Sequence, residues 1–486
     1  GPDGPSLGGF VCPVTTAKGE MWKLGQLHPG DKVHFRLLDL DQAKEIREAE
    51  EANLRHEHQE VVLPEQKDLD YHYAILAEET AAGTKIVARL DGEDNILVEY
   101  GEMELDIAIR FRVHVLMQEL KKKNLPIIDL TPGIRSLQVH FDIEKISLKE
   151  MLAAVLETNR TLPELSDVTV PSRIIWLPLS WDDPQTQLAA KRYQQTVRPN
   201  APWCPSNPEF IRRINGLDSI EDVKKIVFDA DYLVLGLGDV YLGAPVATPV
   251  DPRHRMVTTK YNPARPWTPE NAVGIGGAYL CVYGMEGPGG YQFVGRTIQM
   301  WNPLKETEYF KHGKPWLLDF FDQIRFYPVS AEEILKDRED FLRGRFKIKI
   351  EETSFNLGKY EQFLKEHEDT IRVFKDHQEA SFEAERKMWK EKGLDEFDSE
   401  TQDAPAIVEE TVPDGCEAAR TNIPGSVWKV LVEDGQKVRE GDTLVILESM
   451  KMEFPVTAEY SGTIEKVYLK PGEQVNSGQL AASIRV

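Results

Sequence analysis

The chain has 486 residues, of which 41% are hydrophobic and 29% are charged, and this length predicts roughly two to four domains. Its formal net charge of −23 argues against a nucleic-acid-binding surface, because phosphate contacts need a basic face. We expect no membrane span, since the sequence contains no run of about 18 apolar residues.

Residues 1–80 predict short strands and one helix. The strands are GFVCPVTT and KVHFRLLDL, and a charged helix rich in Ala and Glu follows at about 40–60. The opening GPDGPSLGGF lacks the basic and apolar regions of a signal peptide and looks like the middle of a domain. Four cysteines lie far apart without a CxxC pair, which indicates free thiols in a reducing, cytoplasmic compartment.

The stretch 81–330 alternates short strands and helices. IVARL, NILVEY, SLQVHFD and RIIWLPLSW have strand character, and helical stretches are expected at 105–123, 147–159 and 184–197. This order favours an α+β fold with mixed sheets. The Gly-, Pro- and aromatic-rich segment WTPENAVGIGGAYLCVYGMEGPGGYQFVGRTIQMW predicts β-hairpins.

Segment 236–280 is the densest in residues that could carry chemistry. Its glycines would let the backbone approach a ligand closely, but no clean strand–turn–helix follows, which argues against a dinucleotide site. The candidate site residues are Asp239, Tyr241, His254, Lys260, Asn262 and Arg265. Each candidate also has a non-catalytic interpretation. Asp239 could be an Asx-turn residue, Lys260 and Arg265 could be surface charges, and His254 could be a loop histidine.

Residues 331–395 predict helices, because Phe, Leu, Ile, Val and Trp recur every three or four positions on both sides of the strand-like KIKIEETSF. Residues 396–414 are acidic and contain few large apolar residues, which predicts a flexible linker. Such a tether keeps an attached domain at high effective concentration near its partner sites.

Residues 415–486 contain an internal repeat. NIPGSVWKVLVEDGQKVREGDTL is echoed by EYSGTIEKVYLKPGEQVNSGQL, which predicts two similar hairpin units. Lys451, between Met450 and Met452, is expected at the tip of a tight hairpin. This region resembles the biotinyl domain of biotin-dependent carboxylases, in which the lysine of Met-Lys-Met carries biotin. A lipoyl domain has the same fold, but its lysine more often follows Asp, so the methionines favour biotin.

The segment GLGDVYLGAP…TPENAVGIGGAYLCVYGMEGPGGYQFVGRT resembles the paired subunits of bacterial 5-oxoprolinase, and SLGGFVCP and QLHPGDKVHFR resemble the end of the other subunit. Together with the biotinyl domain, this order of parts resembles the urea carboxylase family, as in fungal urea amidolyase. The resemblance implies a mostly β, α+β protein with cyclophilin-like β-barrel carboxyltransferase halves, a helical connecting segment and a C-terminal biotinyl/lipoyl-type β-barrel.

The implied domains follow the same order. Residues 1–80 would be the C-terminal part of a first carboxyltransferase half, truncated at its start, and 81–330 the second half. Residues 331–395 would be a helical connector, 396–414 the acidic flexible linker, and 415–486 the biotin carboxyl carrier domain.

The resemblance implies a biotin-dependent ligase activity: transfer of CO2 from carboxybiotin to a urea nitrogen, giving allophanate. Biotin would be attached to Lys451, flanked by Met450 and Met452. ATP, Mg²⁺ and bicarbonate would be used by a biotin carboxylase domain that has no counterpart here. Expected partners are urea, that carboxylase domain, a biotin protein ligase and an allophanate hydrolase domain, with no nucleic acid and no membrane.

Urea chemistry suggests roles for the candidates. Asp239 could accept the NH2 protons, and Lys260 or Arg265 could hold the transferred carboxylate. Tyr241, Asn262 and His254 could orient the substrate, and no metal site is expected. Three alternatives stay open: carboxylation of guanidine or another small amide, a 5-oxoprolinase-like component, and a kinase-binding module, for which the exposed Lys451 would have no use.

Overall fold

The computed structural model describes residues 14–486 except 29, 58–63, 82, 239–241, 396–411, 414 and 450–451. The internal contacts divide the chain into two compact units. The N-terminal unit contains residues 9–171 and 354–366, and the barrel–carrier unit contains residues 172–353 and 367–486. The stretch 81–330, which the sequence predicts as one domain, therefore contributes residues to both units.

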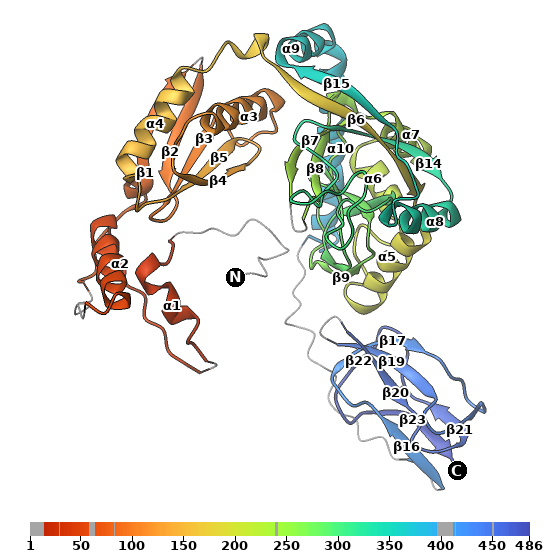
Figure 1. Ribbon diagram of the computed structural model, residues 1–486. Helices are drawn as coiled ribbons and strands as arrows, with labels where there is room; N and C mark the ends of the chain where they lie inside the picture. The colour runs from red at the N-terminus through yellow and green to blue at the C-terminus, as the bar shows by residue number, and fades with distance from the viewer. Residues whose placement is uncertain are drawn as a thin grey trace. The chain divides into compact units, whose positions relative to one another are not determined.

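The N-terminal unit is built on one antiparallel sheet with helices packed against it (Figure 1). Its strand order is β1-β2-β3-β5-β4, with β1 at Ile75–Ala81, β2 at Thr84–Leu90, β3 at Asn95–Tyr100, β4 at Ile127–Pro132 and β5 at Ser136–Phe141. Helix α3 (Ile107–Lys121) packs on β4, β5 and helix α4 (Leu148–Arg160). Alternation along β3 and β5 turns residues such as Ile96, Val98, Leu137 and Val139 into the core.

Helix α2 (Leu40–Leu54) confirms the predicted charged helix, with an end six residues earlier than the pattern suggested. It begins at a capping box: the Gln42 N–H donates to Asp39 Oδ1 at 2.9 Å, and the Asp39 N–H donates to Gln42 Oε1 at 3.1 Å. The predicted strand over 32–39 is wrong. These residues are described but pair with no described neighbour, and an apolar alternating run forms a strand only beside another strand.

The barrel–carrier unit contains a closed barrel of seven strands, in the order β13-β10-β11-β8-β7-β14-β6, with β13 pairing back to β6. The strands are β6 (Thr169–Trp181), β7 (Tyr232–Leu237), β8 (Pro245–Pro249), β10 (Ala272–Gly276), β11 (Tyr279–Val282), β13 (Gln292–Arg296) and β14 (Gln323–Val329). β15 (Ile350–Asn356) extends the sheet beside β6, and β9 (Arg265–Thr268) pairs separately with β12 (Gly287–Gly289). The predicted mostly-β barrel is confirmed.

One apolar core fills the barrel. It includes Leu177, Val234, Val273 and Ile324, each with no exposed area. Burial of each such side chain contributes about 1.5–3 kcal/mol relative to exposure. The core therefore holds strands from four distant parts of the sequence in register around the closed sheet.

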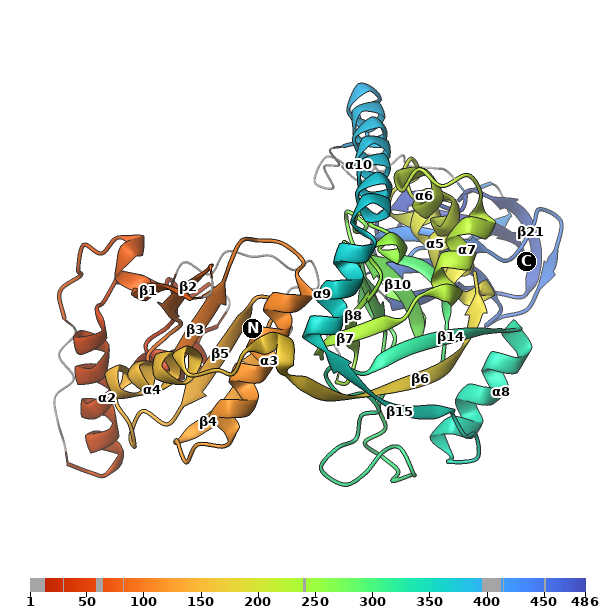
Figure 2. The same ribbon diagram turned by 90° about the horizontal axis from the view of Figure 1, so that it is seen from above.

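Helices cover the outside of this barrel. They are α5 (Pro184–Thr196), α6 (Asn207–Ile214), α7 (Ile220–Asp229), α8 (Ala331–Leu342) and the long α10 (Glu368–Glu391), whereas α9 (Leu357–Glu366) belongs to the N-terminal unit. Both ribbon views place α10 beside α6 (Figures 1 and 2). The rings of Phe210 and Trp389 stack at 5.9 Å, and Gln378 Nε2 donates to Asn215 Oδ1 at 2.7 Å. The predicted helices of 331–395 are thus confirmed, and α10 packs against the barrel side.

The C-terminal region forms two four-stranded sheets around its own core. Their strands are β16 (Cys416–Arg420), β17 (Gly425–Val430), β18 (Lys437–Val438), β19 (Thr443–Ser449), β20 (Met452–Thr457), β21 (Gly462–Val467), β22 (Gln474–Val475) and β23 (Leu480–Arg485). The sheets are ordered β16-β23-β21-β18 and β20-β19-β17-β22. The short strand of each repeat half pairs with the long strand of the other half, β18 with β21 and β22 with β17. This exchange explains the internal repeat.

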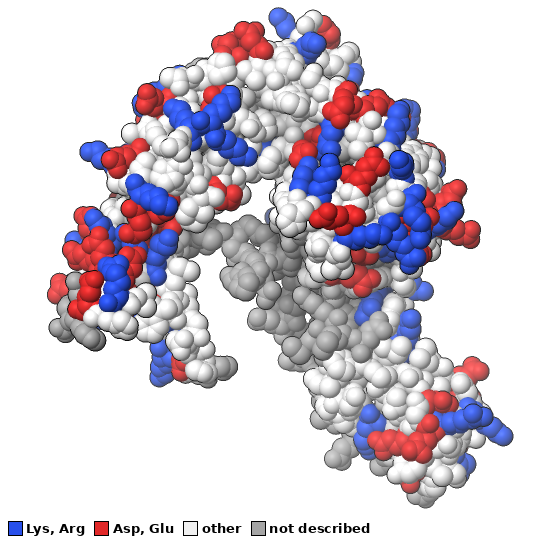
Figure 3. All heavy atoms as spheres, in the orientation of Figure 1, with Lys and Arg blue, Asp and Glu red and all other residues white. Residues whose placement is uncertain are grey.

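Charge is mixed on the surface. In Figure 3, Lys and Arg side chains are interspersed with Asp and Glu over the visible face, so the net charge of −23 forms no single acidic patch there. Within the described ranges, none of the helices has both the length and the apolar character that a bilayer span requires.

Candidate functional site

The hairpin of β19 and β20 surrounds the candidate attachment lysine. Ser449 lies opposite Met452, Glu448 opposite Glu453, and Leu447 opposite Phe454. Only two residues, Met450 and Lys451, connect the strands, and both lie outside the described residues, as does the Met452 side chain. The predicted strand pair on either side of Lys451 is confirmed.

Buried apolar side chains anchor this hairpin in the core of the C-terminal region. Leu444 and Leu447 of β19 have no exposed area, and Val456 of β20 belongs to the same core. A two-residue connection between antiparallel strands is short and tightly constrained. The arrangement therefore fixes the strand ends from which residues 450 and 451 extend, as a domain that presents one lysine for modification requires.

In the barrel, Lys260 lies over the ring of Tyr291. Its side chain is exposed, and Nζ is 5.4 Å from the ring centroid. Backbone and side-chain hydrogen bonds join the two segments: the Tyr261 N–H donates to the Gly290 carbonyl at 2.7 Å, and Gln292 Nε2 donates to the Thr259 carbonyl at 2.9 Å. The result is a cation held at the surface beside an aromatic face, a position suited to an anionic group.

Gly276 makes room for that ring. A Cβ at this position would lie 2.3 Å from Cδ1 of Tyr291, closer than any real carbon contact. The absence of a side chain at 276 therefore seats Tyr291 against β10, and with it Lys260.

Arg265 lies five positions after Lys260 in the sequence, but its side chain is buried inside the domain. It has no exposed area, and its guanidinium is 4.1 Å from the Tyr261 ring centroid and 3.8 Å from that of Phe293. Nη1 donates to the Tyr291 carbonyl at 2.6 Å. These contacts give Arg265 a structural part in positioning residue 291, and its carboxylate-binding role stays a prediction.

Asn262 is exposed at the surface of the same loop. Its carbonyl accepts from Arg198 Nη1 at 2.7 Å, and the Asn262–Pro263 peptide bond is cis. The Tyr193 hydroxyl donates to the Pro263 carbonyl at 2.9 Å. The loop that presents Lys260 and Asn262 is thus tied to α5 and the segment after it.

His254 is half-buried and lines a small cavity of about 10 Å3 with Tyr232, Pro249 and Met256. The Tyr232 hydroxyl is buried and has no hydrogen-bond partner in the part of the chain that the structure describes. The cavity is lined mostly by apolar side chains, and its volume is about that of a single water. The pKa of the nearby Asp251 carboxyl is below its ordinary value. Burial alone would raise that pKa, but the hydrogen bonds from Arg253 together have the larger effect.

The structure brings some of the predicted residues together and separates others. Lys260 contacts the Tyr291 ring, Arg265 at the start of β9 donates to the Tyr291 carbonyl, and Asn262 lies between them in the sequence. Asp239 and Tyr241 lie outside the described residues, in the connection that follows Leu237 of β7. His254 lies by Tyr232, at the other end of β7, and a strand of this length spans roughly 17–20 Å.

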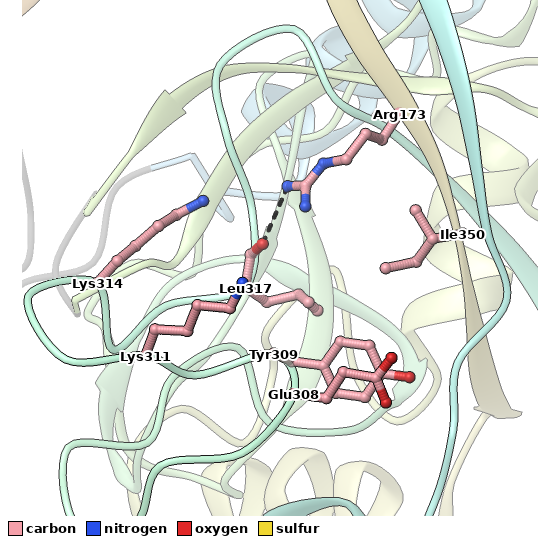
Figure 4. Close-up of a pocket in the computed structure, with 7 residues that line it drawn as sticks. All are labelled: Arg173, Glu308, Tyr309, Lys311, Lys314, Leu317 and Ile350. Atoms are coloured by element: carbon pink, nitrogen blue, oxygen red, sulfur yellow. Dashed lines mark hydrogen bonds between the residues drawn. The ribbon is translucent and has the colours of Figure 1, made fainter.

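A pocket that the sequence did not reveal lies where β6 begins (Figure 4). It has a volume of about 300 Å3 and is lined by Arg173, Glu308, Tyr309, Lys311, Lys314, Leu317 and Ile350. Arg173 is anchored by Asp322, which lies 149 positions later in the chain. A pattern of neighbouring residues does not predict a contact over that sequence distance. In contrast, the PGGY sequence that contains Tyr291 was present in the family resemblance and could have marked that ring as a site residue.

Comparison with protein families gives three matches. Residues 86–310 match the carboxyltransferase domain, subdomain C and D, and residues 1–37 match the carboxyltransferase domain, subdomain A and B. Residues 411–484 match the family described as biotin-requiring enzyme.

The chain is 37% identical to urea amidolyase from Lachancea kluyveri over 99% of its own length and 27% of that protein. The crystal structure of Kluyveromyces lactis urea carboxylase matches 96% of this chain and 41% of that one, with 36% identity and a TM-score of 0.76. The C-terminal region is 44% identical to a biotinylated protein TB7.3 homolog from Mycobacterium leprae, over 96% of that protein and 14% of this chain. The chain thus spans about a quarter of the L. kluyveri protein.

Proposed function

Because this chain belongs to the urea carboxylase family of biotin-dependent enzymes, we propose that it is the carboxyltransferase and biotin carrier part of a urea carboxylase. It would transfer a carboxyl group from biotin to a urea nitrogen, giving allophanate. The observation that carries this proposal is the extent of the likeness, which continues through 99% of the chain and includes both the carboxyltransferase and the carrier region.

Lys451 is the proposed biotin attachment residue. Met450 and Lys451 of the Met-Lys-Met sequence connect two strands whose inner side chains are buried, and the region matches biotin-requiring enzymes over residues 411–484. An amide link to a lysine needs only an accessible ammonium group and a protein ligase that recognises the surrounding fold. Bound biotin would supply the carboxyl group for transfer.

For the transfer itself, Lys260 is the proposed carboxylate-holding residue, since its ammonium lies at the surface over Tyr291. Asn262 presents an amide on the same loop and would orient urea through its N–H groups. Asp239 would accept from the reacting NH2, and Tyr241 would help to orient the substrate. An amide nitrogen is a poor nucleophile, so holding it in the attacking position should supply much of the rate.

The partners are proposed on the same ground. A biotin carboxylase domain would load biotin with ATP, Mg²⁺ and bicarbonate, a biotin protein ligase would modify Lys451, and an allophanate hydrolase domain would consume the product. A cytoplasmic location is supported by the thiols of Cys204 and Cys416, which form no disulfide in the described part of the chain.

The first test is the intact mass of the chain after co-expression with a biotin protein ligase. We expect a gain of one biotinyl group, which Lys451→Ala abolishes and Lys466→Ala, a change at another lysine of the carrier region, leaves intact. An unchanged parent mass would overturn the carrier assignment.

The second test measures urea-dependent transfer of the carboxyl group from the carboxylated chain, followed as allophanate formed, with guanidine as the competing substrate. Stimulation by urea and loss of stimulation in Asp239→Ala support urea as substrate. Stimulation by guanidine and not by urea would mean that guanidine is the substrate.

A further inference from the structure

We propose that the pocket at the start of β6 binds a small organic oxyanion, a carboxylate or phosphate monoester with a compact apolar body, held by Arg173, Lys311 and Lys314. This site goes beyond the proposed function. None of Arg173, Lys311 and Lys314 is among the residues proposed for carboxyl transfer, although Trp316 of the pocket's loop packs beside Gly243 of the connection that contains Asp239 and Tyr241.

Arg173 is a fixed cation in this pocket. Nε donates to Asp322 Oδ1 at 3.0 Å, and Nη2 donates to the Leu317 carbonyl at 3.1 Å and to Asp319 Oδ2 at 3.0 Å. Burial lowers the pKa of Arg173, but the bond to Asp322 outweighs it, so the guanidinium stays charged. Nη1 takes no part in these bonds or in any other given for the described residues. The held guanidinium therefore offers one oriented donor to a ligand.

Lys311 and Lys314 face each other across a two-residue turn. The Lys311 N–H donates to the Lys314 carbonyl at 3.1 Å, and the reverse bond is 2.9 Å. Gly313, at φ +75°, permits this tight reversal. Like charges directly opposite each other on paired strands are destabilising, and Figure 4 shows both lysine side chains extending toward Leu317 and Arg173. A bound anion would relieve that repulsion.

The carboxylates nearby do not neutralise all of these cations. Arg173 pairs with Asp322 at 2.5 Å and with Asp319 at 3.0 Å, Lys314 pairs with Asp319 at 2.6 Å, and Glu308 lies 3.6 Å from Lys347. Lys311 has no carboxylate within 4.0 Å in the part of the chain that the structure describes. Its ammonium is the group most available to an incoming anion.

The floor of the pocket is apolar and its walls are anchored. Leu317 is buried, and Tyr309 and Ile350 line the other side. The Ile348 N–H donates to the Tyr309 hydroxyl at 3.1 Å, which ties the loop to the strand that follows. A volume of about 300 Å3 lies at the lower end of small-molecule sites. Fixed cations above an apolar floor match an oxyanion attached to a compact apolar body.

The experiment is calorimetric titration of the full chain at low salt with phenyl phosphate, benzoate, inorganic phosphate and benzamide. We expect phenyl phosphate or benzoate to bind more tightly than inorganic phosphate, because only they cover the floor. Benzamide, which has no charge, should not bind measurably. Whichever of phenyl phosphate and benzoate binds more tightly shows whether the site prefers a phosphate or a carboxylate group.

The variants are Lys311→Gln and, as a matched control on the same loop, Lys305→Gln. Loss of one charge-assisted contact should weaken binding about tenfold in Lys311→Gln and leave Lys305→Gln unchanged. Equal binding of benzamide, no binding of either organic anion, or equal weakening in both variants would overturn the site. Because Lys311 is exposed, its substitution should leave the circular dichroism spectrum unchanged, which separates a lost ligand contact from lost folding.

Discussion

At the scale of single residues, two basic side chains five positions apart in sequence have opposite surroundings. Lys260 is exposed over the Tyr291 ring, whereas Arg265 has no exposed area and lies between Tyr261 and Phe293. Both were predicted as carboxylate ligands from residue type alone. Arg suits a buried position between rings because its planar guanidinium is weakly hydrated and stacks on aromatic faces, and this difference separates the two residues.

Arg265→Met should destabilise the barrel by about 3 kcal/mol. The change removes a desolvated contact with two rings and leaves the Tyr291 carbonyl without its Nη1 donor. Urea denaturation of both chains measures the loss. A difference below about 0.5 kcal/mol would show that the guanidinium contributes little to stability.

Lys260→Gln should instead leave stability unchanged and lower the second-order rate of urea-dependent carboxyl transfer about 10- to 100-fold. Its ammonium is exposed, and one charge-assisted bond to a carboxylate contributes about 1.5–3 kcal/mol. Steady-state kinetics at varied urea measures the effect, with Lys305→Gln as the control. An unchanged rate would remove Lys260 from the proposed site.

At the scale of elements, each strand or helix forms for local reasons, but its contacts with neighbours decide which side chains it tolerates. β10 is buried along its whole length, and its two glycines at 274 and 276 lie under Tyr291. In α3, ten of fifteen positions are buried, including three that carry basic side chains, Arg110, Arg112 and His114. Periodicity predicted a helix at α3, and Gly, Pro and aromatic content predicted hairpins around β10, but neither pattern predicted this degree of enclosure.

Gly276→Ala should destabilise the barrel by roughly 1–3 kcal/mol, the usual cost of forcing an atom into a packed core. The new Cβ would lie 2.3 Å from the Tyr291 ring. Gly25→Ala is the control, since its Cβ would meet nothing nearer than 3.5 Å. Thermal unfolding compares the two variants, and equal melting temperatures would contradict the predicted clash.

His114 should make the N-terminal unit less stable in acid. Burial, with the charges of Arg110 and Lys121, lowers the pKa of His114 from 6.5 to about 3. Between these pH values the unfolded chain binds a proton that the folded chain excludes, so stability is full above pH 6.5 and falls as pH decreases, by at most about 1.4 kcal/mol per pH unit.

His114→Leu should therefore reduce the difference between urea midpoints measured at pH 7 and pH 5. His28→Leu serves as the control, because the His28 side chain is 83% exposed. The same pH dependence in both variants would assign the acid sensitivity to other groups.

At the scale of the whole molecule, the chain combines a barrel with a small C-terminal carrier region that has a separate core. The carrier core contains Val427, Leu444, Leu447 and Ile464, none of which belongs to the barrel core. Among the described residues, the strands of its two sheets pair only with other strands of the carrier region. A region that buries its own apolar side chains needs no other part of the chain to fold.

Residues 412–486 expressed alone should accordingly fold cooperatively and accept biotin on Lys451 from a biotin protein ligase. Circular dichroism melting and intact mass measure the two properties. A non-cooperative melt, or modification only in the full chain, would mean that the barrel side is needed for folding or recognition.

The sequence by itself determined the carrier region, with its repeat, its strands and the Met-Lys-Met tip, and most of the helices and strands of 81–395. These features depend on alternation, periodicity and short turns, which are properties of neighbouring residues. It also placed Lys260 and Asn262 on one loop, since two positions separate them.

Only the tertiary structure decided the closure of the barrel by β13 and β6, the burial of Arg265, and the pair of Arg173 with Asp322. The partners in each case are separated by about 26 to 149 positions, as in the bonds from Arg265 to residue 291 and from Arg173 to residue 322. Such contacts form where packing of the whole core brings distant segments together, and a pattern of adjacent residues contains no record of them.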